Sequence, residues 1–543
     1  MVQFKKYFPL ILFCTLIIVA LIYSWPFFKS GYFVTDDGEW AIIRASEMVR
    51  ELKDRQIPPR WSDFLNHGFG YPLFSFVYPF PYYLAAGLKL IGLSYVAGIK
   101  FLFVLSVVLS ALFMFLFINK LLGHWAAFIA SLFYVTAPYR LTDLYIRGSL
   151  GESLSLSLFP LIFYLTLKIF EKTSLIGSSV LSVFLAILIL THNVSALLFI
   201  PLWMLLVLFL VSFKYKKDRH RLAICYFNIF FLGISLAAYF VIPALIEKKF
   251  LYLSRMLLAD PKTYFLTLEK LINLNAAKSS DYVFSLGLPQ VIALTLSFIF
   301  FLKKSVKMLR TDISSFIYLF SLTSLFPLVY LTQNSSYLLW QIPPLNMIDF
   351  PYRIMVLIIF LASTLSGYLA RNKISLFLGL LLVVYAVVGN FSLISPSGFF
   401  RKNDAYYYTN DATTTAKDEL TPNWVIEKPK SRYASKVEII FGRAEINQLL
   451  YNSKSISFQL KALSAGSLQI NTIYFPGWKF KMNNKEIPIG YNNPRGLITF
   501  AFPQGTSQIS GRFTETPLRL AADIISLTAI IFIISRLIYV RKG

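Results

Sequence analysis

Cysteine is nearly absent from this chain of 543 residues, which contains only Cys14 and Cys225. Both lie inside apolar runs, where a cysteine behaves as a small hydrophobic side chain. A disulfide framework and a cysteine-based metal site are therefore excluded. Histidine is scarce as well, with four residues, and the His-Glu-x2-His sequence of zinc hydrolases does not occur.

Two further classes of function lack their usual sequence signals. No Gly-x4-Gly-Lys-Ser/Thr sequence is present, so ATP is not the evident energy source. Almost no ionisable side chain falls in the middle of an apolar run, whereas ion-coupled transporters need such groups near the centre of the membrane. These absences favour an enzyme that uses an activated lipid over a pump.

Acidic residues are few, because 27 Asp and Glu stand against 52 Lys and Arg, which gives a formal net charge of +25. An excess of this size is also found in proteins that bind nucleic acid. Here, however, the basic residues gather in short gaps between apolar runs, as at 214–221 and 303–310. This pattern is typical of the cytoplasmic loops of membrane proteins, so no nucleic acid partner is predicted.

Apolar residues are abundant and make up 56% of the chain, which is too much for a soluble protein of this length. Thirteen segments approach the roughly 20 residues that cross a bilayer. They are 7–27, 72–92, 95–118, 124–138, 152–170, 174–192, 194–213, 221–246, 286–302, 313–332, 353–370, 374–392 and 517–538. The sequence therefore predicts an α-helical, multi-pass protein of the plasma (cytoplasmic) membrane.

The basic loops decide how many of these segments cross. If all of them crossed, the loops at 214–221 and 303–310 would lie outside, and removing one crossing before residue 139 corrects this. Segment 72–92 is the favoured exception, because its prolines and aromatic residues suit a helix that lies along the interface. The alternative is the short segment 124–138. We expect about twelve transmembrane helices, with both termini in the cytoplasm.

This topology places the polar segments 28–71, 139–151 and 333–352, the loop after 246, and all of 393–516 on the extracytoplasmic side. The chemistry of the protein is therefore predicted to face outward. We expect three parts: a transmembrane domain over 1–392 with a large first external loop at 28–71, an extracytoplasmic loop and β-rich domain over 393–516, and a final helix with a cytoplasmic tail over 517–543.

The β-rich domain is predicted from about residue 435 onward. Apolar residues alternate there as they do in strands, for example at Ile456, Phe458 and Leu460. Asn483-Asn484 offers a tight turn between two such strands. A compact domain of strands is therefore expected before the last helix.

The first external segment opens with three carboxylates, Asp36, Asp37 and Glu39. Like charges this close together repel one another, so folding alone does not favour them. They suit a bound cation, or a base that removes a proton from an incoming hydroxyl. The alternative is that Asp36 or Asp37 caps a helix over about 39–55.

The second external segment combines Arg140, Asp143, Arg147 and Glu152 with two glycines. An arginine at this place can bind a phosphate through two parallel hydrogen bonds, and a carboxylate can help to hold a divalent ion. The alternative is that these charged side chains simply reach water at the membrane boundary.

Three more polar residues lie at the predicted outer ends of spans. His192 is a candidate for ligand binding, although a lone histidine at such a place is more often an interfacial hydrogen-bonding group. Glu247 is a further candidate, with a solvated helix end as the alternative. Arg353 is expected at headgroup depth, where an arginine binds lipid phosphate.

Several of these sequences together resemble one known group of proteins. They are the Asp36-Asp37 loop, Gly68–Phe74, Tyr78–Tyr83, Ala137–Glu152, Thr191–Asn193, Pro243–Glu247, Asp349–Arg353 and Tyr474–Trp478. The set is similar to bacterial membrane proteins catalogued as "6-pyruvoyl-tetrahydropterin synthase-related", which are YfhO-like and belong with the glycosyltransferases of the GT-C fold. The resemblance spans nearly the whole chain, and 137–152 is its most specific part.

The resemblance implies a GT-C-like helical core and an enzyme that takes a sugar from a polyprenyl-phosphate carrier. In such enzymes an acid of the first external loop acts as base or binds the metal, and an acid of the second loop assists. By position this nominates Asp36 and Asp37, followed by Asp143 or Glu152.

Other residues receive roles from the same resemblance. Arg147 and Arg353 would neutralise the donor phosphate with the help of His192, and Arg140, Glu39 and Glu247 are additional candidates. A divalent cation, Mg or Mn, would be held by Asp36, Asp37 and Asp143. One position departs from the pattern, because relatives often have a histidine where this chain has Trp40.

The predicted function is therefore a membrane glycosyltransferase of cell-envelope glycan biosynthesis. It would move a sugar from a polyprenyl-phosphate donor to an extracytoplasmic glycan, lipid or protein acceptor. The chief alternative is a non-enzymatic factor that translocates lipid or polysaccharide. A third alternative is a cell-envelope assembly factor that docks through its β-rich domain.

Overall fold

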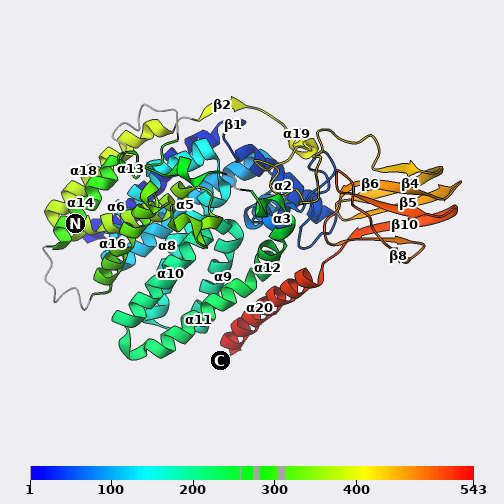
Figure 1. Cartoon of the computed structure of the whole chain (residues 1–543). Helices are drawn as coiled ribbons and strands as arrows, with labels where there is room; N and C mark the ends of the chain where they lie inside the picture. The colour runs from blue at the N-terminus through cyan, green and yellow to red at the C-terminus, as the bar shows by residue number, and fades with distance from the viewer. Residues whose placement is uncertain (1, 257–258, 273–281, 303–311, 395, 543) are drawn as a thin grey trace.

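The structure is a computed structural model that describes residues 2–256, 259–272, 282–302, 312–394 and 396–542. A bundle of helices forms most of the molecule, and a domain of β-strands extends from one end of it (Figure 1). After the strands the chain returns along the bundle as helix α20 (Pro517–Lys542). The predicted class, a mostly helical membrane protein with a C-terminal β-sheet domain, is confirmed at this level.

Seven helices of the described chain are long and apolar enough to cross a membrane, or eight if one bent pair counts as a single span. The seven are Tyr95–Leu122 (α5), Leu150–Glu171 (α8), Asn193–Phe213 (α10), Ile313–Leu331 (α16), Pro351–Arg371 around α17 (Met355–Ser366), Lys373–Leu393 around α18 (Lys373–Gly389), and Pro517–Val540 within α20. Four shorter apolar helices are Tyr7–Tyr23 in α1 (Val2–Tyr23), α6 (His124–Val135), α9 (Leu175–Thr191) and α14 (Leu288–Leu302). If the bent pair is one span and each of these four helices also crosses, the number reaches twelve, which remains a prediction.

The predicted single span over 221–246 is two helices. Helix α11 (Arg219–Leu236) and helix α12 (Ala238–Glu247) meet at a bend of 71°. The bend separates the amide of Tyr239 from the carbonyl of Ser235, and Ser526 of α20 bridges them. Its hydroxyl accepts from the Tyr239 amide at 2.9 Å and donates to the Ser235 carbonyl at 3.0 Å. The broken backbone is thus satisfied by a neighbouring helix, as apolar surroundings require.

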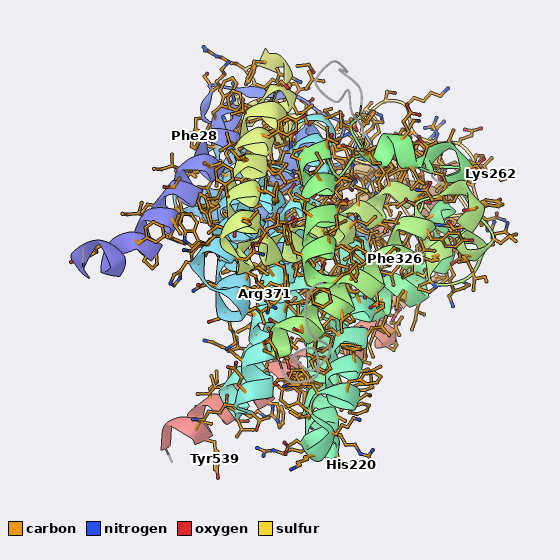
Figure 2. The ribbon with its side chains drawn as sticks, turned by 90° about the vertical axis from the view of Figure 1, so that its left-hand side faces the viewer. Phe28, His220, Lys262, Phe326, Arg371 and Tyr539 are labelled. Atoms are coloured by element: carbon orange, nitrogen blue, oxygen red, sulfur yellow. The ribbon has the colours of Figure 1, made fainter. Side chains whose placement is uncertain are left out.

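Residues 72–92 form the short helices α3 (Leu73–Phe76) and α4 (Phe80–Leu90), and neither is among the candidate spans. The basic loop 214–221 joins α10 to α11. In Figure 2 His220 and Tyr539 lie at one end of the bundle and Phe28 at the other. The second predicted basic loop, 303–310, lies outside the described residues. Which end faces the cytoplasm stays a prediction.

The first external segment holds strand β1 (Tyr32–Val34) and helix α2 (Gly38–Lys53), close to the predicted helix over 39–55. Helix α2 buries an apolar face that includes Ile42, Ala45 and Met48. Such a stripe is what an amphipathic helix needs in order to pack against a core.

The segment after 393, which is predicted to be an extracytoplasmic loop, crosses over this first segment. Its strand β2 (Ser397–Phe400) pairs antiparallel with β1, and helix α19 (Asp404–Thr409) follows. Asp404 forms an ion pair of 2.6 Å with Lys89 of α4, and Thr414 accepts a hydrogen bond of 3.3 Å from Arg44 of α2. The segment therefore fastens α2 to the bundle.

Several short elements lie in the connections between the longer helices. They are η1 (Trp25–Phe28), η5 (Tyr252–Ser254), η6 (Pro261–Tyr264), α13 (Leu268–Ile272), η8 (Asn334–Ser336), η9 (Leu339–Gln341) and η10 (Leu345–Met347).

The strand domain consists of two antiparallel sheets. Their strands are β3 (Val437–Phe441), β4 (Ala444–Asn452), β5 (Ser455–Ala462), β6 (Gly466–Ile473), β7 (Trp478–Met482), β8 (Lys485–Ile487), β9 (Leu497–Phe502) and β10 (Gly505–Phe513). One sheet has the order β4-β5-β10-β7-β8 and the other β3-β6-β9. The alternating residues Ile456, Phe458 and Leu460 are buried, as expected of an inward-facing strand side. Asn483 and Asn484 both have positive φ and close the β7–β8 hairpin, which is a favoured turn geometry.

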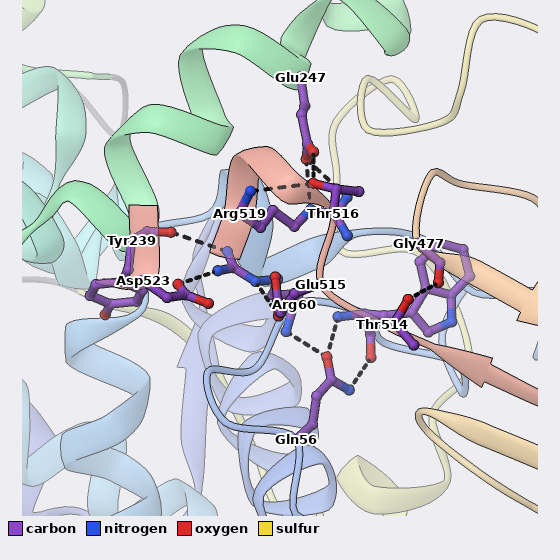
Figure 3. A network of polar contacts seen from close by, with 11 residues as sticks. Gln56, Arg60, Tyr239, Glu247, Gly477, Thr514, Glu515, Thr516, Arg519 and Asp523 are labelled. Carbon is purple, nitrogen blue, oxygen red and sulfur yellow. Dashed lines mark hydrogen bonds and ion pairs between the residues drawn. The ribbon is translucent and has the colours of Figure 1, made fainter. Parts of the chain in front are cut away.

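A buried ionic network joins the strand domain to the bundle (Figure 3). Arg60 of the first segment is fully buried and pairs with Glu515 at 2.8 Å and with Asp523 of α20 at 2.6 Å. Arg519 of α20 pairs with Glu247 of α12 at 2.9 Å. These contacts fix α20 against both parts of the molecule.

Candidate functional site

The second external segment folds into a short helix, α7 (Pro138–Thr142), and a π-helical turn, η2 (Asp143–Arg147). Gly148 ends the turn with a φ of 64°, a conformation that glycine adopts without strain. A Cβ at this position would lie 2.4 Å from the Thr35 hydroxyl and 2.9 Å from the Gly38 amide nitrogen. Glycine is therefore required for the close approach of the first external segment.

Backbone hydrogen bonds hold the first segment on this turn. The Asp36 amide donates to the Ile146 carbonyl at 3.0 Å, and the Asp37 amide donates to the Arg147 carbonyl at 2.8 Å. The acids of the first segment are thus attached to the charged turn of the second, although about a hundred residues separate them in sequence.

Arg147 is the centre of a buried charged group. Its Nη1 forms ion pairs of 2.8 Å with both Asp143 and Glu152. The Ser153 hydroxyl donates to Asp143 at 2.6 Å, and the Tyr139 hydroxyl donates to Glu152. The second Glu152 oxygen, Oε2, is buried without a hydrogen-bond partner in the described part of the chain. Burial, with the nearby Glu152 charge, raises the pKa of Asp143.

Arg140 lies deeper than Arg147 and is completely buried. Its Nη2 donates to the Ser106 carbonyl at 3.0 Å, whereas Nε and Nη1 find no partner among the described residues. Asp143 is within electrostatic reach of it. A buried arginine needs a compensating anion, so we interpret Arg140 as a support for Asp143 rather than a group that meets a ligand.

His192 lies between α9 and α10 and is 5% exposed. Its Nδ1 accepts a hydrogen bond from the Ser195 amide at 3.2 Å, so the imidazole caps α10 and its proton is on Nε2. The ring packs against Tyr78 with centroids 5.1 Å apart. Burial lowers the pKa of His192 to about 3. The imidazole is therefore neutral, and Nε2 is a fixed hydrogen-bond donor.

Arg353 is half-buried and lies beside this charged group. Glu152 and His192 are both within its electrostatic reach. Its guanidinium lies 5.0 Å from the centre of the Phe350 ring, and its Nε is buried without a partner in the residues described. No ion pair of Arg353 occurs within the described segments, so its charge is available to an anion.

The three first-segment carboxylates have separate surroundings. Asp36 is exposed, and both its oxygens accept hydrogen bonds from the Tyr282 hydroxyl, at 2.9 and 2.8 Å. Partial burial raises the pKa of Asp36. Asp37 occupies the N-cap position of α2, but the Thr35 hydroxyl, not Asp37, accepts from the Gly38 amide. Asp37 therefore stands at the N-cap position that the capping alternative predicts, but its side chain does not cap the helix.

Asp37 and Glu39 differ in whether another residue compensates their negative charge. The Asp37 carboxylate has no hydrogen bond or ion pair with the described chain. It is close enough to Tyr78 to add to the raised pKa that burial gives that phenol. Glu39 pairs with Lys402 at 2.6 Å, so its charge is compensated by the crossing segment.

The donor atoms do not fit the predicted cation site. The described residues contain no group of three His, Cys, Asp or Glu side chains that could hold a metal ion. The Asp143 carboxylate already forms an ion pair with Arg147 and accepts a hydrogen bond from Ser153, and the Asp36 carboxylate accepts from Tyr282. Glu247, another candidate, pairs with Arg519 at the joint of the two domains. It belongs to the structural network of Figure 3.

Two residues of this site were missed in the sequence. Tyr139 lies inside the stretch 137–152, where its spacing from Glu152 could have drawn attention. Tyr282 lies in a loop without any pattern, and only the folded chain brings it to Asp36.

Comparison with known proteins gives the following similarities. A family model described as "6-pyruvoyl-tetrahydropterin synthase related domain; membrane protein" matches residues 74–396. An uncharacterized protein of Lactococcus lactis subsp. cremoris (strain MG1363) is 25% identical over 252 residues, which cover 45% of this chain and 40% of that protein.

Solved structures with some likeness include two membrane transferases. The apo oligosaccharyltransferase of Archaeoglobus fulgidus is 15% identical with a TM-score of 0.48, covering 81% of this chain and 63% of that one. The arabinofuranosyltransferase AftD from Mycobacteria is 16% identical with a TM-score of 0.46, covering 70% of this chain and 26% of that one. The chain thus spans less than two thirds of each of these proteins.

Proposed function

The chain belongs to the family of membrane proteins described as 6-pyruvoyl-tetrahydropterin synthase related, and from this premise we propose that it is a membrane glycosyltransferase. It would take a sugar from a polyprenyl-phosphate carrier and pass it to a glycan, lipid or protein acceptor. The reaction would occur on the extracytoplasmic side, with both termini in the cytoplasm. The helical core would be GT-C-like and cross the membrane about twelve times.

One observation carries the proposal. Four separate segments supply Asp37, Arg147, His192 and Arg353, and these residues are linked by backbone hydrogen bonds or electrostatic reach. Backbone bonds attach Asp37 to Arg147, and His192 lies within electrostatic reach of both Arg147 and Arg353. A base, a fixed hydrogen-bond donor and an unpaired cation are the parts that transfer from a lipid phosphate needs.

Arg353 is the group that favours an anionic ligand. Arg147 is compensated by Asp143 and Glu152, with which it forms ion pairs of 2.8 Å, whereas Arg353 has no ion pair in the described chain. The phosphate of the donor would supply a negative charge for Arg353.

The proposed step is a single displacement at the anomeric carbon of the sugar. The acceptor hydroxyl gives its proton to Asp36 or Asp37, and its oxygen forms the new glycosidic bond. The bond between the anomeric carbon and the phosphate oxygen breaks, and the electron pair leaves with the polyprenyl phosphate. Arg353 and the Nε2–H of His192 would stabilise the charge that develops on this oxygen. Arg147, already held by two carboxylates, would position the acids.

The direct test uses purified full-length protein in lipid nanodiscs with labelled polyprenyl-phosphate sugars and mixed acceptors. Transfer is expected to move label from the organic phase to the acceptor. The reaction is run with and without Mg or Mn, because the predicted cation has no fitting site among the described residues. If the label stays on the lipid under every condition, or the lipid crosses the bilayer with its sugar intact, the transferase proposal is wrong.

A further inference from the structure

Three aromatic rings form a continuous stack beside the candidate site. Tyr282 stacks on Phe284 with ring centroids 5.5 Å apart and an interplanar angle of 23°. Phe284 in turn stacks on Tyr352 at 3.9 Å and 7°. The guanidinium of Arg147 lies 5.3 Å from the centre of the Tyr352 ring. The stack therefore runs from the buried arginine to the exposed acid of the first segment.

The two ends of this stack differ in exposure. Tyr352 is 7% exposed beneath Arg147, whereas Tyr282 is 49% exposed. One face of Tyr282 is covered by Phe284, and its hydroxyl is engaged with both oxygens of Asp36. Tyr282 is thus held at its hydroxyl and on one ring face, while about half of the residue stays exposed.

A ring in this position has a definite chemical use. The face of an aromatic ring carries partial negative charge and attracts groups with partial positive charge, such as the polarised C–H bonds of a sugar. A pyranose in its chair form presents several axial C–H bonds on one side and keeps its hydroxyls at the edge. A furanose offers no comparable flat apolar face.

We propose that the open face of Tyr282 is the subsite for the donor sugar, that this sugar is a hexopyranose, and that the Tyr282 hydroxyl positions Asp36 for its role as base. The inference rests on the proposed function and deepens it. With the sugar on Tyr282, the adjacent Asp36 would be on the acceptor side and the stack would lead toward Arg147 and Arg353. The phenol thus acts in two separable ways, through its ring and through its hydroxyl.

These two roles can be tested with two substitutions. Tyr282→Phe keeps the ring and removes the hydrogen bond, whereas Tyr282→Ala removes both. Tyr385 of α18 provides the matched control, because it is 48% exposed and has no hydrogen bond in the described chain. Tyr385→Phe and Tyr385→Ala should behave as the unsubstituted protein. All variants are prepared as full-length protein in nanodiscs, and their thermal unfolding is compared first.

The first measurement is equilibrium binding of a labelled polyprenyl-phosphate hexopyranose without any acceptor. Tyr282→Ala is expected to weaken binding about tenfold, the size of a good aromatic contact, and Tyr282→Phe should stay within about twofold. The same lipid with a furanose is expected to bind more weakly to the unsubstituted protein and to lose little with Tyr282→Ala. Equal binding of the hexopyranose to the unsubstituted protein and Tyr282→Ala would overturn the subsite.

The second measurement is the pH dependence of transfer. The hydrogen bond from Tyr282 favours the charged form of Asp36, so removing it raises the pKa of that carboxyl further. Tyr282→Phe should therefore move the acidic limb of the rate profile to higher pH, with little change in KM. An unmoved limb would overturn the positioning role, as would a loss of thermal stability that accounts for the lost rate.

The outcomes also separate this inference from the proposed function. If the hexopyranose lipid binds and Tyr282→Ala weakens it, but no acceptor ever receives label, the subsite stands and the transferase proposal fails. If transfer occurs with a furanose donor only, the transferase proposal stands and the hexopyranose subsite fails. If no polyprenyl-phosphate sugar binds, both are wrong.

Discussion

The amide of Asp37 donates a hydrogen bond of 2.8 Å to the carbonyl of Arg147. Because this contact is made by the backbone, the first external segment docks on the second without using its carboxylates. The acids can therefore be neutralised without undoing the assembly that presents them. Substitutions of Asp36 and Asp37 therefore report on chemistry rather than on folding.

Asp37→Asn and Asp36→Asn are expected to lower the transfer rate by a factor of roughly 10² to 10⁴, the usual contribution of a general base. Expression and thermal stability should stay close to those of the unsubstituted protein. Glu39→Gln is the matched control, because Glu39 pairs with Lys402 and is expected to keep most of the activity. Full activity of both aspartate variants would remove this pair from the mechanism.

Gly148→Ala should impair both stability and activity. Alanine at a φ of 64° costs about 1–2 kcal/mol, and its Cβ would in addition lie 2.4 Å from Thr35. Gly92→Ala is the control, because Gly92 also has a positive φ of 100° but open space around its Cβ. The apparent Tm of both variants is measured in nanodiscs, together with donor transfer. If Gly148→Ala and Gly92→Ala lower the apparent Tm and the donor transfer equally, the contact with Thr35 has no importance.

Arg353→Ala is expected to weaken binding of the lipid donor about 10- to 100-fold, since a charged hydrogen bond contributes about 1.5–3 kcal/mol. The effect should appear in KM for the donor and diminish at high salt, where charges are screened. Arg371→Ala serves as the comparison, because Arg371 is also partly exposed but is engaged by Asp312. A loss in Arg371→Ala equal to that in Arg353→Ala would point to a general effect of surface charge.

Two substitutions of His192 should separate its roles. Asparagine is a good N-cap residue, so His192→Asn is expected to retain most of the stability of α10, whereas His192→Ala loses about 1 kcal/mol. Both variants lack the Nε2 donor and should transfer more slowly. Since burial lowers the pKa of His192 to about 3, the imidazole is neutral from pH 5 to 8. Neither variant should therefore remove an inflection from the rate profile in that range.

Glu247 is expected to act on stability. Glu247→Gln leaves Arg519 buried without its anion, which typically costs about 3–5 kcal/mol. The double variant Glu247→Leu/Arg519→Met removes both charges and should recover much of the loss. Thermal unfolding of the three proteins is compared with their donor binding. A Glu247→Gln protein of normal stability that no longer transfers sugar would instead place Glu247 in the site.

The sequence was sufficient for features that depend on neighbouring residues. Apolar runs predicted helices over nearly the observed ranges, and Asn483-Asn484 predicted a hairpin turn. The same local reasoning did not predict the bend between α11 and α12 within 221–246, because this bend is supported by Ser526 from a distant part of the chain. Nor did it predict that the loop after 393 pairs with β1 and fastens α2.

By itself, the sequence determined that this is a membrane protein with its unusual polar residues in a few loops, because hydrophobicity and charge are properties of composition and order. Only the tertiary structure decided which of those residues meet. It brought Asp36 to Tyr282 and Asp37 to Arg147, and it assigned Glu247 to the domain joint. These pairings depend on how distant backbone segments pack together, and no spacing along the chain encodes that packing.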